Sequence, residues 1–132
     1  MKNLIQIFCT IFDTTIEKNG FTFSISQNKF IEGRGFAVAN IKNSERIFEN
    51  FENIDKIKFL CILKNFYIEN IVNFLDNKNL CLGGWVDNGR LYLDVSTVLY
   101  SKKEALRIAS ANGELAIFDL STFETIYLKK TS

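Results

Sequence analysis

Hydrophobic and polar positions recur with two different periods along this chain, and the changes of period divide it into helices and strands. Over residues 3–18, Leu4, Phe8 and Ile11 recur at the spacing of one helical face. This spacing favours an amphipathic helix that packs on a core over a short signal sequence. The same reasoning predicts helices over 62–77 and 101–112. Strict alternation predicts a half-buried strand over 21–26, and short strand-like runs predict a strand over 36–39, a buried strand over 115–118 and an edge strand over 125–128.

The strongest local signal is Asp87-Asn88-Gly89, which lies between two strand-like runs within residues 80–96. Asn and Gly tolerate the positive φ of a tight primed turn, so these residues predict a central β-hairpin. In its second strand, Leu91 and Leu93 should face one way, and Tyr92 and Asp94 the other. The resulting order predicts an α+β fold with a single, mostly antiparallel sheet of about five or six strands and about three packed helices.

Residues 41–58 carry a less clear pattern. Ser44 is a candidate cap for a short helix that would contain Ile47, Phe48 and Phe51, and residues 53–58 then interrupt the periodicity. Further on, strand 90–96, helix 101–112 and strand 115–119 are candidates for a βαβ crossover. The chain of 132 residues has no repeat or linker, so we expect residues 1–132 to form one domain with one core.

Composition narrows the classes of function. Apolar residues make up 47% of the chain, which is ample for a core, and the formal net charge of +1 disfavours direct contact with nucleic acid. No segment is long enough to span a membrane as a helix, so we expect no membrane association. Cys9, Cys61 and Cys81 form no CxxC pair and are expected to be buried free thiols in a reducing compartment.

The candidate chemistry is sparse. Histidine is absent, which removes the commonest general base and the commonest metal ligand. The acidic candidates Asp87, Asp94, Asp119 and Glu104 each have a structural explanation: a turn, a polar strand face, a strand end and a helix cap that forms a capping box with Ser101. Since a Ser or Cys nucleophile would also lack a base, we expect no enzymatic activity, no cofactor and no metal.

Interaction residues are easier to nominate. We predict partner contacts at Arg34, Trp85, Arg90, Tyr92 and Tyr100, because Trp, Tyr and Arg are favoured at binding hot spots. A core position is the stronger expectation for Trp85, whereas Tyr92 should be exposed if only one face of the hairpin is buried. Alternatively, Arg34 and Arg90 could clamp the phosphate of a nucleotide second messenger while Trp85 and Tyr92 stack on its base.

Several blocks together resemble a family of small uncharacterised proteins scattered through phages, plasmids and other mobile elements. The resemblance covers about residues 19–128 and departs most at 41–60. Its most specific parts are Gly-Gly-Trp-Val-Asp at 83–87 and Leu-Asp-Val-Ser at 93–96; the others are Asn19 to Ser24, Gly35 to Ala39, Glu104 to Leu106 and Ala116 to Leu120. It implies no catalytic residue.

The mobile-element resemblance bears on function and partners. Small proteins of this class often act by stoichiometric binding, and inhibitors of host defence, including anti-CRISPR proteins, are among them. We therefore expect a cytoplasmic binding protein of the host cell whose partner is a bacterial protein in a defence complex, such as a CRISPR effector. A homodimer that pairs through its last strand is the remaining alternative.

Overall fold

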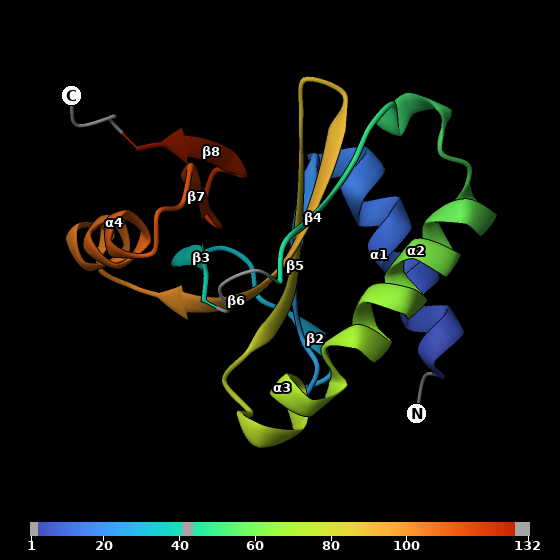
Figure 1. The fold of residues 1–132 in the computed structure, drawn as a ribbon, viewed down its shortest axis with the longest axis horizontal. Coiled ribbons are helices and arrows are strands. Elements are labelled where there is room, and N and C mark those ends of the chain that lie inside the picture. The colour runs from blue at the N-terminus through green and yellow to red at the C-terminus, as the bar shows by residue number, and fades with distance from the viewer. Residues whose placement is uncertain (1–2, 41–43, 129–132) are drawn as a thin grey trace.

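The fold is α+β, with four α-helices and one curled antiparallel sheet (Figure 1). This computed structural model describes residues 3–40 and 44–128. In chain order the elements are α1 (Leu4–Lys18), β1 (Gly20–Ser24), β2 (Lys29–Phe30), β3 (Phe36–Ala39), β4 (Arg46–Phe48), the 3₁₀-helix η1 (Phe51–Asn53), α2 (Lys56–Glu69), α3 (Ile71–Asp76), β5 (Cys81–Asp87), β6 (Arg90–Leu99), α4 (Lys102–Ala111), β7 (Ala116–Asp119) and β8 (Glu124–Tyr127). Within the described residues, no helix has the length and hydropathy needed to cross a membrane.

The sheet runs in the order β2-β1-β5-β6-β3-β7-β8, and every neighbouring pair is antiparallel. One edge of the long strand β6 pairs with β5. The opposite edge has two partners: residues 91–93 pair with β4, and residues 96–99 pair with β3. The sheet therefore has more strands than the five or six predicted. The additional strands β2 and β4 have two and three residues, too few for an alternating pattern to be recognised.

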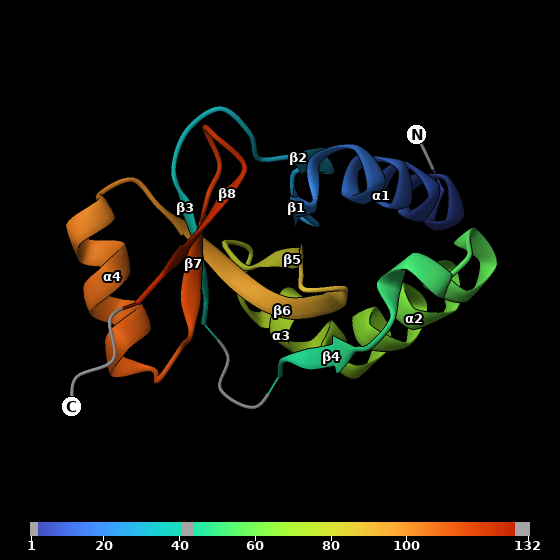
Figure 2. The same cartoon turned by 90° about the horizontal axis from the view of Figure 1, so that it is seen from above.

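The sheet curls so strongly that its concave face becomes an interior. An ideal Cβ on Gly20 in β1 would lie 2.8 Å from the ring of Phe118 in β7, although three other strands of the sheet lie between them in the strand order. A second contact closes the curl in the same way: the Tyr127 hydroxyl at the end of β8 donates a hydrogen bond to Asp87 at the end of β5. Figure 2 shows the result: α1 and α2 cover the outside of the sheet at one end, and α4 covers the outside at the other.

Three groups of buried side chains fill these layers. The largest lies between α1, α2 and the convex face and includes Phe8, Phe21 and Leu93. A smaller group between α4 and the sheet contains Val38, Ala105, Ala109 and Ile117. The third lies inside the curl, where Trp85, Tyr92, Phe118 and Leu120 are buried together.

The predicted hairpin is confirmed. Residues 81–87 and 90–96 pair in register, with Asp87 opposite Arg90, and Asn88 and Gly89 have φ values of 51° and 74°. The helices predicted over 3–18 and 101–112 are also confirmed, with Asn3 and Ser101 as their N-caps. Helix α4 connects β6 to β7, which are parallel to each other because both are antiparallel to β3 between them. This is the predicted crossover.

Several expectations about local structure are wrong, and each has a physical reason. No helix starts at Ser44, because residues 46–48 pair with β6 instead. The helix predicted over 62–77 begins at Lys56, where Asp55 caps it by accepting a hydrogen bond from Lys58 N at 2.8 Å, and it is interrupted at Asn70. The predicted capping box of 101–112 is half formed: Glu104 N donates to Ser101 Oγ, while the Glu104 carboxylate binds Arg107.

Expectations about exposure are also corrected. Strand β1 was expected to be half-buried, yet all five of its residues are buried, because the curl covers the second face. For the same reason Tyr92 is only 7% exposed, so the prediction that it lies on the surface is wrong. The three thiols are free, as predicted, but only Cys81 is buried; Cys9 is half-buried and Cys61 is exposed.

Candidate functional site

A cavity of about 190 Å³ lies inside the curl. Its inner end is formed by Thr22, Gly83 and Asp94, which come from the three adjacent strands β1, β5 and β6. Trp85 and Tyr92 line it beside them, and the half-exposed Ile47 and Leu115 line it near solvent. The cavity therefore reaches from the solvent into the centre of the sheet.

Asp94 is in the cavity because of strand alternation and one glycine. Leu93 and Val95 belong to the core under α1 and α2, so Asp94 must point into the curl. Gly83 is its register partner in β5, and an ideal Cβ at position 83 would lie 2.5 Å from Asp94 Oδ1. Any other residue at position 83 would thus place its side chain in the space of the Asp94 carboxyl group. Asp94 itself is only 7% exposed.

Two further carboxyl groups line the same cavity. Glu45 directly precedes β4 and Glu114 precedes β7, and both are half-buried. Burial, together with repulsion from Glu45 and Glu114, raises the pKa of Asp94 to about 7. Burial also raises the pKa of Glu45, and burial with repulsion from Glu45 raises that of Glu114. The cavity is therefore acidic and contains a carboxyl group that titrates near neutral pH.

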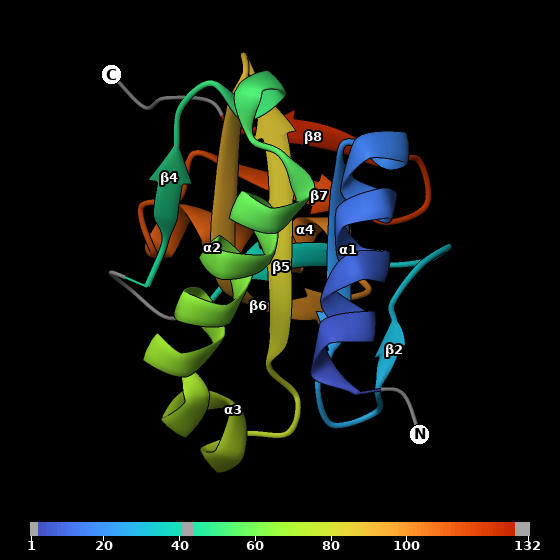
Figure 3. The same cartoon turned by 90° about the vertical axis from the view of Figure 1, so that its right-hand side faces the viewer.

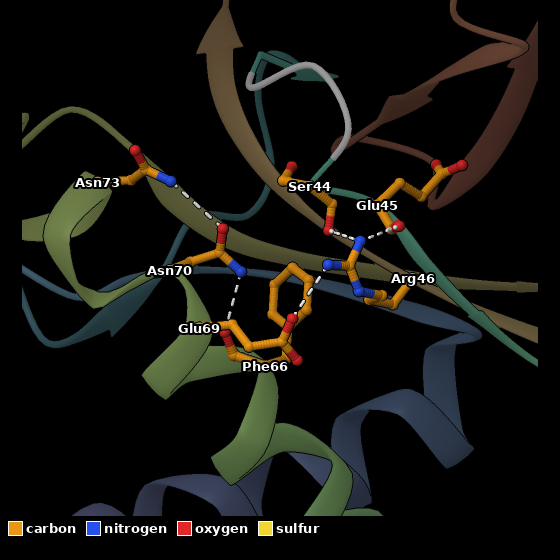
Figure 4. Close-up of polar contacts among 7 residues, drawn as sticks. All are labelled: Ser44, Glu45, Arg46, Phe66, Glu69, Asn70 and Asn73. Atoms are coloured by element: carbon orange, nitrogen blue, oxygen red, sulfur yellow. Dashed lines mark hydrogen bonds and ion pairs between the residues drawn. The ribbon is translucent and has the colours of Figure 1, made fainter.

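Glu45 is held in place through its neighbours, as Figure 4 shows. Arg46 Nη2 lies 3.0 Å from Glu69 Oε2 at the end of α2, and Arg46 Nη1 donates to the backbone oxygen of Glu45 at 3.0 Å. The helix end is itself fixed by Asn70, whose Nδ2 donates to the Phe66 carbonyl at 2.9 Å. The Glu45 side chain extends away from this network. These contacts attach β4 to α2 and leave the Glu45 carboxylate outside that ion pair.

One hydroxyl group at the inner end has unused hydrogen-bonding capacity. Thr22 Oγ1 is buried and has no hydrogen-bond partner among the described residues, whereas the buried Ser96 hydroxyl lies next to Asp94 and opposes the rise of its pKa through a hydrogen bond. Beside them, the rings of Trp85 and Tyr92 stack with centroids 4.1 Å apart and planes 10° apart. The site thus combines a buried carboxyl group, a polar end and an aromatic wall. A carboxyl group with a pKa near neutrality can exchange a proton with a bound molecule or balance a buried positive charge.

The structure places the five predicted contact residues in three different environments. Trp85 and Tyr92 are interior and line the cavity. Arg34 lies on the surface, 4.7 Å from the ring centroid of the exposed Tyr100. Arg90, at the start of β6, donates from Nε to Glu49 Oε2 at 3.1 Å. Neither arginine lines the cavity, so the structure does not assemble the predicted phosphate clamp around it.

The other acidic candidates are engaged outside the cavity. Asp119 accepts hydrogen bonds from the backbone and hydroxyl groups of Ser121, Asp87 beside the hairpin turn accepts one from Tyr127 of β8, and the Glu104 carboxylate binds Arg107 rather than completing its capping box. Asp94 is different, because the face that the alternation predicted to be polar and solvated is enclosed. Gly84 makes room for an aromatic neighbour, because an ideal Cβ there would lie 2.3 Å from the ring of Phe21.

A second surface was missed in the sequence. An apolar groove runs between α1 and α2, which lie side by side on the outside of the sheet (Figure 3). It includes Ile57, which is 75% exposed, Ile5, which is 67% exposed, and Ile68. The signal was available: residues 56–69 carry apolar side chains at nine of fourteen positions, more than one core-facing stripe needs.

Comparisons with known proteins found no match to this chain among family models, curated proteins or solved structures. The resemblance to mobile-element proteins therefore remains a prediction. Among the described residues, no three His, Cys, Asp or Glu side chains are placed to share a metal ion.

Proposed function

We propose that this chain is a non-enzymatic binding protein of a mobile element that inhibits a host defence complex by stoichiometric contact. The observation that carries the proposal is the exposed apolar groove between α1 and α2. Contiguous apolar surface on a small protein commonly marks a contact with another macromolecule. The resemblance to phage and plasmid proteins directs the proposal to bacterial defence proteins such as CRISPR effectors.

The groove has the form of a helix-binding site. Its wall on α2 extends from Ile57 to Ile68, which is about 16 Å at the rise of an α-helix. Val72 and Leu75 on α3, the helix that follows α2, are also strongly exposed. An amphipathic helix recognises such a groove through apolar side chains spaced three and four residues apart.

Charge indicates the partner's composition. Lys64 lines the groove among apolar residues, whereas Lys56 outside it is already paired with Asp13, its Nζ 3.6 Å from Oδ1. The positive charge of Lys64 favours a partner helix with carboxylates beside its apolar face, because opposite charges speed encounter and fix orientation. We therefore propose an amphipathic helix with acidic flanks on a bacterial defence protein as the occupant.

The test is binding of purified CRISPR effectors and other defence complexes to the wild-type chain and to matched variants. Ile57→Glu and Ile68→Glu introduce a charge into the groove and should reduce affinity at least tenfold. Ile16→Glu is the control, since Ile16 is an exposed residue of α1 outside the groove. Equal loss for all three variants, or binding unaffected by the two groove variants, would contradict the proposal.

The alternative is a homodimer that pairs through β8, the last strand, which is an edge of the sheet. Light scattering on the purified chain would then show twice the mass of the monomer, and Ile57→Glu, which changes the groove and not β8, would leave that mass unchanged. The nucleotide-binding alternative receives no support from the interior cavity, because Asp94, Glu45 and Glu114 would repel a phosphate.

A further inference from the structure

We propose that the cavity inside the curled sheet binds an organic cation, an alkylammonium or alkylguanidinium group whose charged head lies against Asp94 and whose stem lies beside Trp85 and Tyr92. This inference is independent of the function proposed for the helical groove. It follows from the charge, the polar atoms and the dimensions of the cavity.

The charge of the cavity is one-sided. Asp94, Glu45 and Glu114 come from three separate segments and line one space of about 190 Å³. Of the residues that line it, all within the described part of the chain, none is Lys or Arg. A buried carboxylate without a counter-charge is strongly unfavourable, so it either holds a proton or receives a cation from outside. A bound ammonium or guanidinium group would supply the missing charge.

The polar atoms point to a ligand with several N–H donors. Thr22 is 2% exposed and lines the cavity, yet its Oγ1 has no hydrogen-bond partner among the described residues. Buried hydroxyl groups are normally bonded to protein or to a bound molecule. The Thr22 oxygen and the Asp94 carboxylate are two acceptors at the same end of the cavity, which suits a head group that donates in more than one direction.

The dimensions and the walls indicate a stem as well as a head. An engineered apolar cavity of about 150 Å³ accommodates benzene, so about 190 Å³ is enough for a group larger than a water molecule or an ammonium ion alone. Away from Asp94 the lining is largely apolar and includes Trp85, Ala37 and Phe118. Alkyl groups are favoured against such walls, and aromatic rings add attraction for the cation.

The experiment is titration calorimetry with n-butylguanidinium, n-butylammonium and the neutral n-butanol at pH 8. The wild-type chain should bind at least one cation and bind butanol at least tenfold more weakly. Asp94→Asn retains the shape of the side chain and should weaken cation binding at least tenfold, while Glu124→Gln, an exposed neutralisation on β8, should leave it unchanged. Thr22→Val should weaken binding several-fold.

The pH dependence provides a second readout. Because Asp94 must be ionised to attract the cation, affinity should be roughly tenfold higher at pH 8 than at pH 6 for a group that titrates near pH 7. Glu45, Glu114 and Tyr92 are the other titratable groups that line the cavity, and Glu45→Gln with Glu114→Gln should weaken binding without removing the pH dependence. If Asp94→Asn does not fold, the combined Glu45→Gln and Glu114→Gln substitutions provide the test of the site instead.

Two sources of the cation are distinguished with blocked amino acids. Stronger binding of N-acetyl-arginine or N-acetyl-lysine methylamide than of the free alkyl cations would indicate a side chain delivered by a protein, and the reverse would indicate a small molecule. Either result supports the site. Failure of every cation to bind at pH 8, or equal binding by Asp94→Asn, would overturn the proposal and leave the function of the helical groove untouched.

Discussion

Position 94 shows how a regular strand pattern can place a charge in the interior. Asp94 alternates with Leu93 and Val95 as the sequence indicates. The face it occupies is covered by β3 and β7 and is not open to solvent as a polar strand face usually is. The space for its carboxyl group exists because residue 83 has no side chain. The interior charge thus depends on two residues that lie opposite each other across the hairpin.

This arrangement makes stability depend on pH in a definite direction. The folded protein keeps the Asp94 proton up to about pH 7, whereas the unfolded chain releases it near the ordinary value of 3.8. The folded state therefore binds more protons between about pH 4 and 7, and stability falls as the pH rises through this interval. Denaturation in urea at pH 5 and pH 8 should show a loss on the order of 3 kcal/mol.

Asp94→Asn should remove most of this pH dependence and make the folded state more stable at pH 8. The raised pKa values of Glu45 and Glu114 act in the same direction, so a smaller slope should remain. Glu124→Gln, an exposed substitution, serves as the control for a general charge effect. A wild-type stability that increases from pH 5 to pH 8 would contradict the assignment.

At the scale of elements, caps and strand pairing decide the boundaries that periodicity leaves uncertain. Asp55 ends the interrupted segment and starts α2, because its side chain satisfies the backbone N–H of Lys58. Asn70 then separates α2 from α3. Residues 46–48 form a strand only because the edge of β6 offers partners for them. The Asp55 cap is a signal in the local sequence, whereas the strand at residues 46–48 depends on a partner strand that is distant in the sequence.

The cap makes a direct prediction for α2. Asp55→Ala should lower the free energy of unfolding by about 1 kcal/mol, because the first turn loses its side-chain acceptor. Asp55→Ser should retain most of the stability, since serine is also a good cap. Urea denaturation monitored by circular dichroism measures both variants. Equal destabilisation by Ala and Ser would mean that the carboxylate acts through something other than capping.

For the whole molecule, the curl determines which parts of the sheet are protected. Strands β5 and β6 lie between two layers and have strand neighbours on both sides, whereas β2 and β8 are the edges. Local opening costs least where a strand has one neighbour and exposed hydrogen bonds. The molecule should therefore open from its edges while the hairpin remains intact.

Hydrogen exchange tests this order. Amides of Leu82 and Leu93 should exchange last, by opening of the whole fold, and those of β8 should exchange first, through fraying. Native-state exchange measured by NMR at increasing urea separates the two classes, because global opening depends strongly on denaturant and fraying does not. Protection of β8 equal to that of β5 would show that the curl is closed more tightly than the strand order implies.

Much of this protein follows from its sequence alone. The α+β class, the helices α1 and α4, the crossover and the hairpin at Asn88-Gly89 depend on local propensity and on periods of a few residues, which are readable without a structure. Tertiary structure alone decided the extent of the curl, the pairing of β4, the burial of Tyr92 and Asp94, and the exposure of the α1–α2 groove. These features depend on which distant segments cover a given face, and an alternating pattern marks two faces without saying what covers either one.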